Sequence, residues 1–115
     1  MDYEFQTSHS GKCWVDEFLD DLNDKEAKKA AWLLKLIQDA PRRENIPSRF
    51  FGKVTGSNGI WEAGVSFGQV EMRFLGFFDQ GALWLNHAFK KKTQQLRQQD
   101  IELAENRKRE FYRNR

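Results

Sequence analysis

The alternation of apolar and polar residues over 61–74 is the strongest structural signal in this chain. Apolar side chains occupy every second position in 61–67 and again in 70–74, and Gly68-Gln69 separates the two runs. A period of two is typical of a strand with one buried face, and a two-residue connection that contains glycine is typical of a tight hairpin. The sequence therefore predicts an antiparallel β-hairpin in which Phe67 lies opposite Val70.

The other periodic segments extend this hairpin into an α+β fold. They are a short strand over 3–7, amphipathic helices over 14–22 and 24–40, a third meander strand over 82–89 and a C-terminal helix over 96–112. Prolines and glycines interrupt the apolar period over 41–59, which predicts an extended loop. The expected order is β-α-α-β-β-β-α, with the two N-terminal helices packed on one face of an antiparallel sheet. Residues 1–115 are enough for one hydrophobic core, so we expect a single domain.

The formal charge of the chain is close to neutral, but it is unevenly distributed. The total is +2, from 19 basic and 17 acidic residues, whereas residues 90–115 hold nine basic and four acidic residues. A second basic segment lies in 42–53, and the first helix is acidic. A bound polyanion would therefore meet the loop after the second helix and the C-terminal end. The alternative is ordinary solvated surface charge.

Cysteine usage and the N-terminal sequence indicate a cytoplasmic protein. The single Cys13 cannot form an internal disulfide, and no apolar run approaches the roughly 18 residues that would cross a bilayer. The N-terminus lacks the basic and apolar regions of a signal peptide. His9, His87 and Cys13 do not have the spacing of metal ligands. We therefore expect no metal, no cofactor and no membrane association.

The polar face of the predicted hairpin brings a carboxylate and a guanidinium together. With Gly68-Gln69 as the turn, Gly64 lies opposite Arg73, and Glu62 lies diagonal to Arg73 on the neighbouring strand. The two charges are either an ordinary cross-strand ion pair or part of a site that cuts RNA without a metal. In that chemistry a base takes the 2′-hydroxyl proton, cations stabilise the crowded phosphorane and an acid protonates the leaving oxygen.

The end of the third meander strand supplies further groups for this chemistry. His87 is a candidate acid or base, with a packing role as the alternative, and the length of the loop at Gln80-Gly81 leaves open which face of the sheet it occupies. A lysine run follows it, and Phe89 is suited to stacking on a base. The candidate catalytic residues are Arg73, Glu62, His87 and Lys90, and the candidate RNA contacts are Lys91, Lys92, Phe89, Lys53, Arg49 and Arg97.

Four motifs in a fixed order resemble a known family. They are GSNGIWE over 56–62, MRF over 72–74, HAFKKKTQ over 87–94 and DIELA over 100–104. Together they resemble the phage-derived, HigB-like branch of the RelE/ParE toxin superfamily, and the resemblance covers most of the chain. It implies a small RelE-like fold and the toxin of a type II toxin–antitoxin pair.

The resemblance carries expectations about individual residues. It implies that Arg73 supports phosphate cleavage, that Glu62 is the carboxylate after the tryptophan and that Lys90–Lys92 are the basic run after the last strand. Many members resemble metal-independent, ribosome-associated messenger RNA endonucleases, whereas ParE-like relatives inhibit DNA gyrase. Relatives commonly have a basic residue where this chain has Gly64, and a proline where it has 96–98. A catalytically inactive protein that represses its operon is therefore a further alternative.

The resemblance also implies partners. They are a helix-turn-helix antitoxin, messenger RNA and the ribosome, with operator DNA contacted only through the antitoxin complex. Five apolar side chains, if exposed, would form a surface for a protein partner: Trp32, Leu36, Leu75, Phe77 and Trp84. The alternative is that these side chains are buried.

Overall fold

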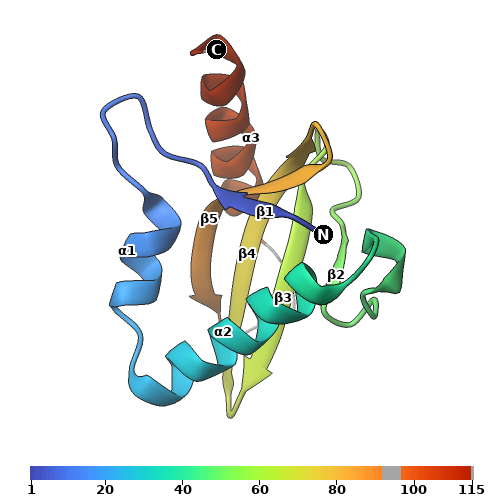
Figure 1. Cartoon of the computed structure of the whole chain (residues 1–115). Coiled ribbons are helices and arrows are strands. Elements are labelled where there is room, and N and C mark those ends of the chain that lie inside the picture. The colour runs from blue at the N-terminus through green and yellow to red at the C-terminus, as the bar shows by residue number, and fades with distance from the viewer. Residues whose placement is uncertain (92–96, 115) are drawn as a thin grey trace.

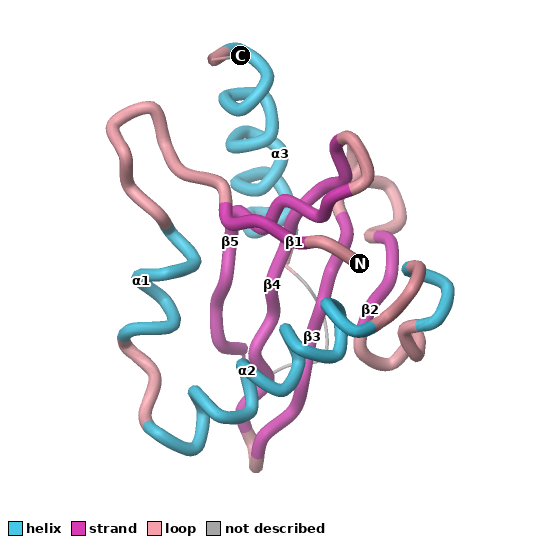
Figure 2. Tube along the Cα trace, in the orientation of Figure 1, coloured by secondary structure: helices cyan, strands magenta, loops and turns pink. Residues whose placement is uncertain are grey.

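In residues 1–91 and 97–114, which the computed structural model describes, the chain forms three α-helices and one five-stranded sheet (Figures 1 and 2). The elements are β1 (Tyr3–Phe5), α1 (Trp14–Asp20), α2 (Asp24–Asp39), the 3-10 helix η1 (Arg43–Asn45), β2 (Phe51–Lys53), β3 (Trp61–Phe67), β4 (Val70–Asp79), β5 (Ala82–Lys91) and α3 (Gln98–Arg113). The predicted α+β class and order of elements are confirmed. The segment 41–59, predicted as a loop, also contains η1 and the short strand β2.

The sheet has the strand order β1-β5-β4-β3-β2. The neighbours β2 to β5 pair antiparallel, and β1 pairs parallel with β5 at the edge. In the central hairpin Phe67 pairs with Val70 and Gly64 pairs with Arg73, as the two-residue turn predicts. The alternation in 61–74 was therefore sufficient to predict which hairpin residues share a face.

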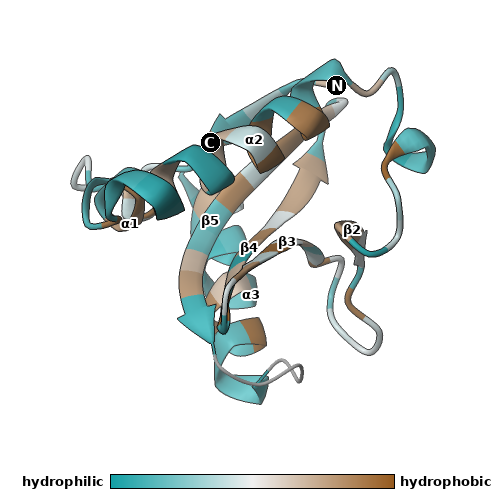
Figure 3. Cartoon of the chain, turned by 90° about the horizontal axis from the view of Figure 1, so that it is seen from below, coloured by the Kyte–Doolittle hydropathy of each residue, from teal (hydrophilic) through white to brown (hydrophobic). Residues whose placement is uncertain are grey.

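Helices cover both faces of the sheet (Figure 3). Helices α1 and α2 pack on one face, where the larger part of the core includes Leu33, Ile37 and Phe74. Helix α3 packs on the other face, where a smaller cluster joins Ile60 and Leu75 to Ala104 of the helix. The prediction that the two N-terminal helices share one face is confirmed.

Most of the predicted exposed apolar patch lies under α3. Leu75 and Phe77 are fully buried, so of the two alternatives burial holds for them, and they are not part of a surface for a partner. Phe111 of α3 packs on Phe77 and on Trp84, with ring centres 5.1 and 4.8 Å apart. The C-terminal helix thus covers these side chains within the same chain. Trp32, by contrast, is 44% exposed on α2.

A β-bulge in β5 determines which side chains of its C-terminal half face α3. The loop Gln80-Gly81 has two residues, since Asp79 pairs with Ala82, but the register shifts by one between Leu75 and Gly76. Leu85 pairs with Gly76 and His87 pairs with Leu75, so Asn86 is the extra residue of the bulge. The shift places His87 on the face of Arg73. A methyl group at Gly76 would lie 2.1 Å from the carbonyl oxygen of Trp84, so this close approach needs glycine.

Candidate functional site

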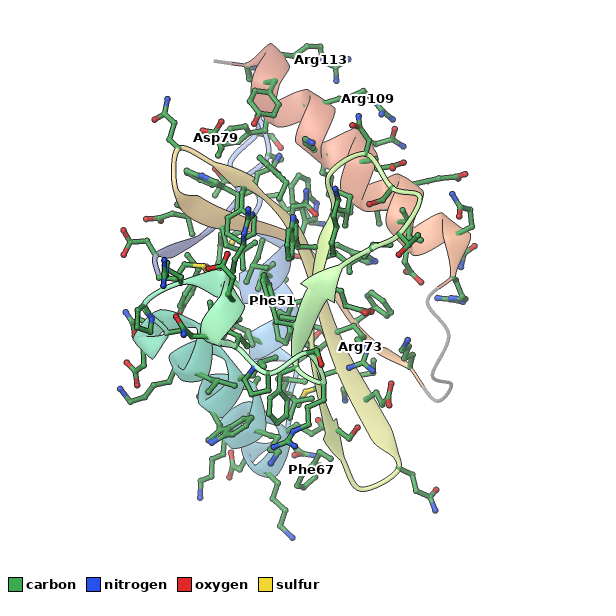
Figure 4. The ribbon with its side chains drawn as sticks, turned by 90° about the vertical axis from the view of Figure 1, so that its right-hand side faces the viewer. Phe51, Phe67, Arg73, Asp79, Arg109 and Arg113 are labelled. Carbon is green, nitrogen blue, oxygen red and sulfur yellow. The ribbon has the colours of Figure 1, made fainter. Side chains whose placement is uncertain are left out.

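Arg73 lies on β4, the middle strand of the sheet, and is labelled in Figure 4. It pairs with Gly64 of β3. A Cβ atom at Gly64 would lie 1.8 Å from Nη1 of Arg73. Only a residue without a side chain leaves this space for the guanidinium. The glycine at position 64 therefore determines where the cation of Arg73 lies.

Two carboxylates hold the guanidinium in place. Nη2 of Arg73 donates to Oε2 of Glu71 at 2.6 Å, and Nε lies 3.5 Å from Oε2 of Glu62. The Arg73 side chain is only 13% exposed, and that of Glu71 is 10% exposed. The three charges therefore form a largely buried group in which each charge has an opposite neighbour. The predicted pairing of Glu62 with Arg73 is present, and Glu71 is a second partner.

A pocket of about 240 Å³ opens beside this group, between β2, β3 and β4. Its wall includes Arg49, Phe50, Lys53, Glu62, Gly64 and Arg73. The structure thus brings two of the predicted RNA contacts, Arg49 and Lys53, to the pocket of the predicted catalytic pair. Three cations and one carboxylate around a small concave surface favour an anionic ligand such as a phosphodiester.

His87 lies on the same face as Arg73, one strand away. It pairs with Leu75, and Arg73 pairs with Phe89, so His87 and Arg73 are diagonal neighbours, typically about 7–8 Å apart. Nε2 of His87 donates to Oδ1 of Asp100 at 2.9 Å, because a carboxylate only accepts. Burial lowers the pKa of His87 below its ordinary value of 6.5, and the hydrogen bond to Asp100 opposes this change. The imidazole is therefore neutral at pH 7, with Nδ1 as its basic nitrogen.

Two other predicted contacts lie next to His87. The ring of Phe89 stacks on the imidazole with ring centres 4.8 Å apart. Nε of Arg97 donates to Oδ2 of Asp100 at 3.2 Å, so the guanidinium lies at the edge of the histidine site. Asp100, in the first turn of α3, therefore accepts hydrogen bonds from both His87 and Arg97.

The lysine run divides between the two faces of the sheet. Lys91 pairs with Glu71 and so shares the Arg73 face; burial lowers its pKa, and the charge of Arg73 acts in the same direction. Lys90 pairs with Met72 on the opposite face, where its Nζ lies 2.9 Å from Oε1 of Glu26 on α2. The structure therefore does not bring Lys90 to Arg73. Lys92 lies outside the described residues.

Sequence reasoning did not assign a role in the site to Glu71 or Asp100. Glu71 was within reach of prediction, because it lies two residues before Arg73 on a strand and so shares its face. Asp100 was not, because its contact with His87 depends on how α3 docks on the sheet. Nothing in the local pattern of either segment specifies that docking.

Among the described residues there is neither a metal-binding cluster nor a membrane-spanning helix. Within residues 1–91 and 97–114, no group of three or more histidine, cysteine, aspartate or glutamate side chains is arranged to hold a metal ion. Among the helices in the same residues, none is long and apolar enough to cross a membrane.

Comparison with known proteins gave one match. The model of the family described as "Phage derived protein Gp49-like (DUF891)" matches residues 17–109, which include β2 to β5 and most of α3. No curated protein and no solved structure matches the chain.

Proposed function

We propose that this chain, which belongs to the phage-derived Gp49-like family, is the toxin of a type II toxin–antitoxin system that cleaves messenger RNA on the ribosome without a metal ion. The family, the toxin-like motifs and the order of elements support this proposal. Because one fold can host several activities, the site supports cleavage more specifically than the fold does.

The position of the Arg73 guanidinium is the observation that supports the proposal most directly. The guanidinium lies over Gly64 in a pocket that Arg49 and Lys53 also line, so a phosphate bound there meets several cations. Fixed donors that face developing negative charge stabilise a transition state without reorganising. The hydrogen bond to Glu71 orients the guanidinium before substrate arrives, and the carboxylate of Glu62 adds electrostatic attraction from the other side.

His87 and Glu62 are the candidate groups for proton transfer. Nδ1 of the neutral His87 is suited to take the proton of the 2′-hydroxyl, which then attacks the adjacent phosphorus. The bond to the leaving 5′-oxygen breaks, and that oxygen takes a proton from solvent water, while the carboxylate of Glu62 in the pocket is an alternative acceptor of the 2′-hydroxyl proton. The products are a cyclic phosphate and a 5′-hydroxyl end. Arg73 keeps its proton and stabilises the phosphorane.

The partners in this proposal follow from the toxin assignment. A helix-turn-helix antitoxin neutralises the chain, and operator DNA is contacted only through that complex. The ribosome positions the message for a small domain of 115 residues. Toxin and target meet in the cytoplasm.

The test is to change the guanidinium while keeping the chain folded. Arg73→Ala would leave Glu71 buried without its partner, which typically costs about 3–5 kcal/mol. Arg73→Lys keeps the charge, and the double variant Arg73→Met with Glu71→Gln removes both charges together. We expect both variants to cleave ribosome-bound message roughly 100-fold more slowly than the native chain, with helical content retained.

Arg109→Lys is the matched control, since Arg109 is exposed on α3, far from Arg73 in Figure 4. It should cleave at the native rate. Native cleavage rates in both folded Arg73 variants would refute the proposed mechanism.

One observation favours a second candidate function. Glu62 and Glu71 together neutralise Arg73, and Gly64 removes a cation that similar toxins commonly have. Such a site suits a gyrase inhibitor or an inactive toxin-fold protein that represses its operon with the antitoxin. Induction in cells separates the candidates. Rapid loss of message and protein synthesis indicates the nuclease, a DNA-damage response with intact translation indicates gyrase, and neither response indicates the repressor.

A further inference from the structure

The exposed face of α2 carries a tryptophan among lysines. Trp32 is 44% exposed. At 3.6 residues per turn, four lysines of α2 lie within about 60° of it around the helix axis. They are Lys25, Lys28, Lys29 and Lys35. Asp39 is on the same face and pairs with Lys35 at 3.2 Å. This outer face of α2 is therefore basic, with one large aromatic ring at its centre.

Aromatic rings and cations continue from this face to the segment before β2. Nζ of Lys29 lies 4.9 Å from the ring centre of Trp32, and the ring of Phe50 packs edge-on against Trp32 at 5.1 Å. The guanidinium of Arg49 lies 4.8 Å from the ring centre of Phe50. Four side chains from two segments thus form one row, in which two adjacent rings lie between two cations.

This row ends at the candidate site. Arg49 and Phe50 both line the pocket that contains Arg73. The backbone fixes the junction, because the carbonyl of Phe50 accepts a hydrogen bond from the amide of Gly64 at 2.9 Å. The contacting side chains of this row therefore extend from α2 to the pocket.

The chemistry of the row favours unpaired nucleotides over a protein partner. Exposed aromatic rings between cations are typical of sites for single-stranded nucleic acid, where bases stack on the rings and phosphates contact the cations. Lysine, by contrast, is depleted from protein–protein interfaces. A protein partner would bury the four lysines around Trp32. A nucleic-acid strand would instead offer each of them a phosphate.

We propose that the outer face of α2, together with Arg49 and Phe50, binds single-stranded RNA and leads it into the Arg73 pocket. A base stacks on Trp32, and Lys28 and Lys29 contact the phosphates beside it. This inference rests on the proposed function in one respect. The proposed function places the scissile phosphate at Arg73, and this sets the direction of the RNA strand.

Binding of a short 2′-O-methyl RNA, followed by fluorescence anisotropy, tests the stacking. This RNA lacks the attacking hydroxyl, so binding is measured on the native chain whether or not the chain is a nuclease. We expect Trp32→Ala to weaken binding at least fivefold. Trp32→Phe keeps a ring and should restore part of the affinity. Tyr112→Ala is the matched control, since Tyr112 is 43% exposed at the other end of the molecule, and it should bind like the native chain.

The salt dependence tests the phosphate contacts. For single strands, the slope of log affinity against log salt falls by about 0.7 for each phosphate that the protein no longer neutralises. We expect the double variant Lys28→Gln with Lys29→Gln to reduce the slope by about 1.4. The double variant Arg109→Gln with Arg113→Gln removes the same charge at the far end of α3 and should keep the native slope (Figure 4).

The outcomes separate this inference from the proposed function. Unchanged RNA affinity in Trp32→Ala overturns the proposed RNA-binding surface. An equal decrease in the salt slope of both double variants also overturns it. Loss of antitoxin binding in Trp32→Ala with intact RNA affinity also overturns it and assigns the face to a protein. If RNA binding depends on Trp32 but the chain does not cleave message, the RNA-binding surface is supported and the nuclease function is excluded.

Discussion

At the scale of single residues, the absence of a side chain at Gly64 is as important as the guanidinium of Arg73. The guanidinium occupies the volume that a Cβ atom would take, so the position of the cation depends on the residue opposite it. This close approach follows from the register Gly64–Arg73, which the alternation in 61–74 predicts.

Substitution of this glycine should affect cleavage more than stability. In Gly64→Ala the flexible end of Arg73 moves away, and a displacement of about 1 Å at a catalytic group is enough for roughly a 100-fold loss of rate. Cleavage assays and thermal unfolding measure the two effects. Gly52→Ala is the control, because Gly52 lines the same pocket with open space around its Cβ position. Native cleavage by Gly64→Ala would contradict the proposed role of the guanidinium.

The environment of His87 predicts a pH dependence. Burial lowers its pKa, so the cleavage rate should fall on acidification with a midpoint below 6.5. Asp100 raises this pKa, so Asp100→Asn should move the midpoint further down, as a pH–rate profile would measure. Because the folded pKa lies below the unfolded one, His87 also contributes stability that is present above pH 6.5 and lost as pH falls. A midpoint above 6.5 would exclude His87 as the base.

At the scale of secondary structure, the bulge at Asn86 explains which part of the site could be predicted. In the central hairpin the turn fixes the register, so the positions of Glu62, Gly64 and Arg73 follow from the sequence. In β5 the two-residue loop alone would place His87 on the α2 face, and the extra residue reverses this. A bulge depends on packing from α3 and β1, so the local pattern does not reveal it.

Strand alternation places Lys90 and Lys91 on opposite faces of the sheet, and the bulge determines which of them faces Arg73. Lys90 lies on the α2 face, where its hydrogen bond lowers the pKa of Glu26, whereas Lys91 lies on the Arg73 face. We expect Lys90→Met to cleave RNA within about twofold of the native rate, and Lys91→Met to cleave at least about tenfold more slowly. Parallel cleavage assays of the two variants give the comparison. Equal decreases would mean that the face of the sheet does not determine the role of these lysines.

At the scale of the whole molecule, a buried polar network joins β1, β5 and α3. The side chain of Gln6 donates to the carbonyl of Arg107, and Nη1 of Arg107 donates to the carbonyl of Asn86 at 2.6 Å. The side-chain amide of Asn86 donates to Gln6 and to the carbonyl of Ala104. These bonds satisfy polar groups that the bulge leaves without strand partners, and they fix α3 over the sheet.

Removal of this network should destabilise the fold. In Arg107→Met the buried carbonyl of Asn86 has no donor, and the guanidinium no longer packs on the ring of Trp14. We expect a decrease of about 1–3 kcal/mol in the free energy of unfolding, measured in urea. Arg109→Met, on the exposed side of the same helix, should change stability by less than about 0.5 kcal/mol. Similar decreases in both variants would contradict a specific role for the network.

The parallel pairing of β1 with β5 also sets the order of events during synthesis. Tyr3–Phe5 is made long before its partner Leu83–Leu85, and at 5–20 residues per second about 4–16 s separate the two strands. The strands of the Arg73 pocket are all made before His87 and α3. A nascent chain therefore contains every residue of the Arg73 pocket before it contains the proposed base His87 and its partner Asp100.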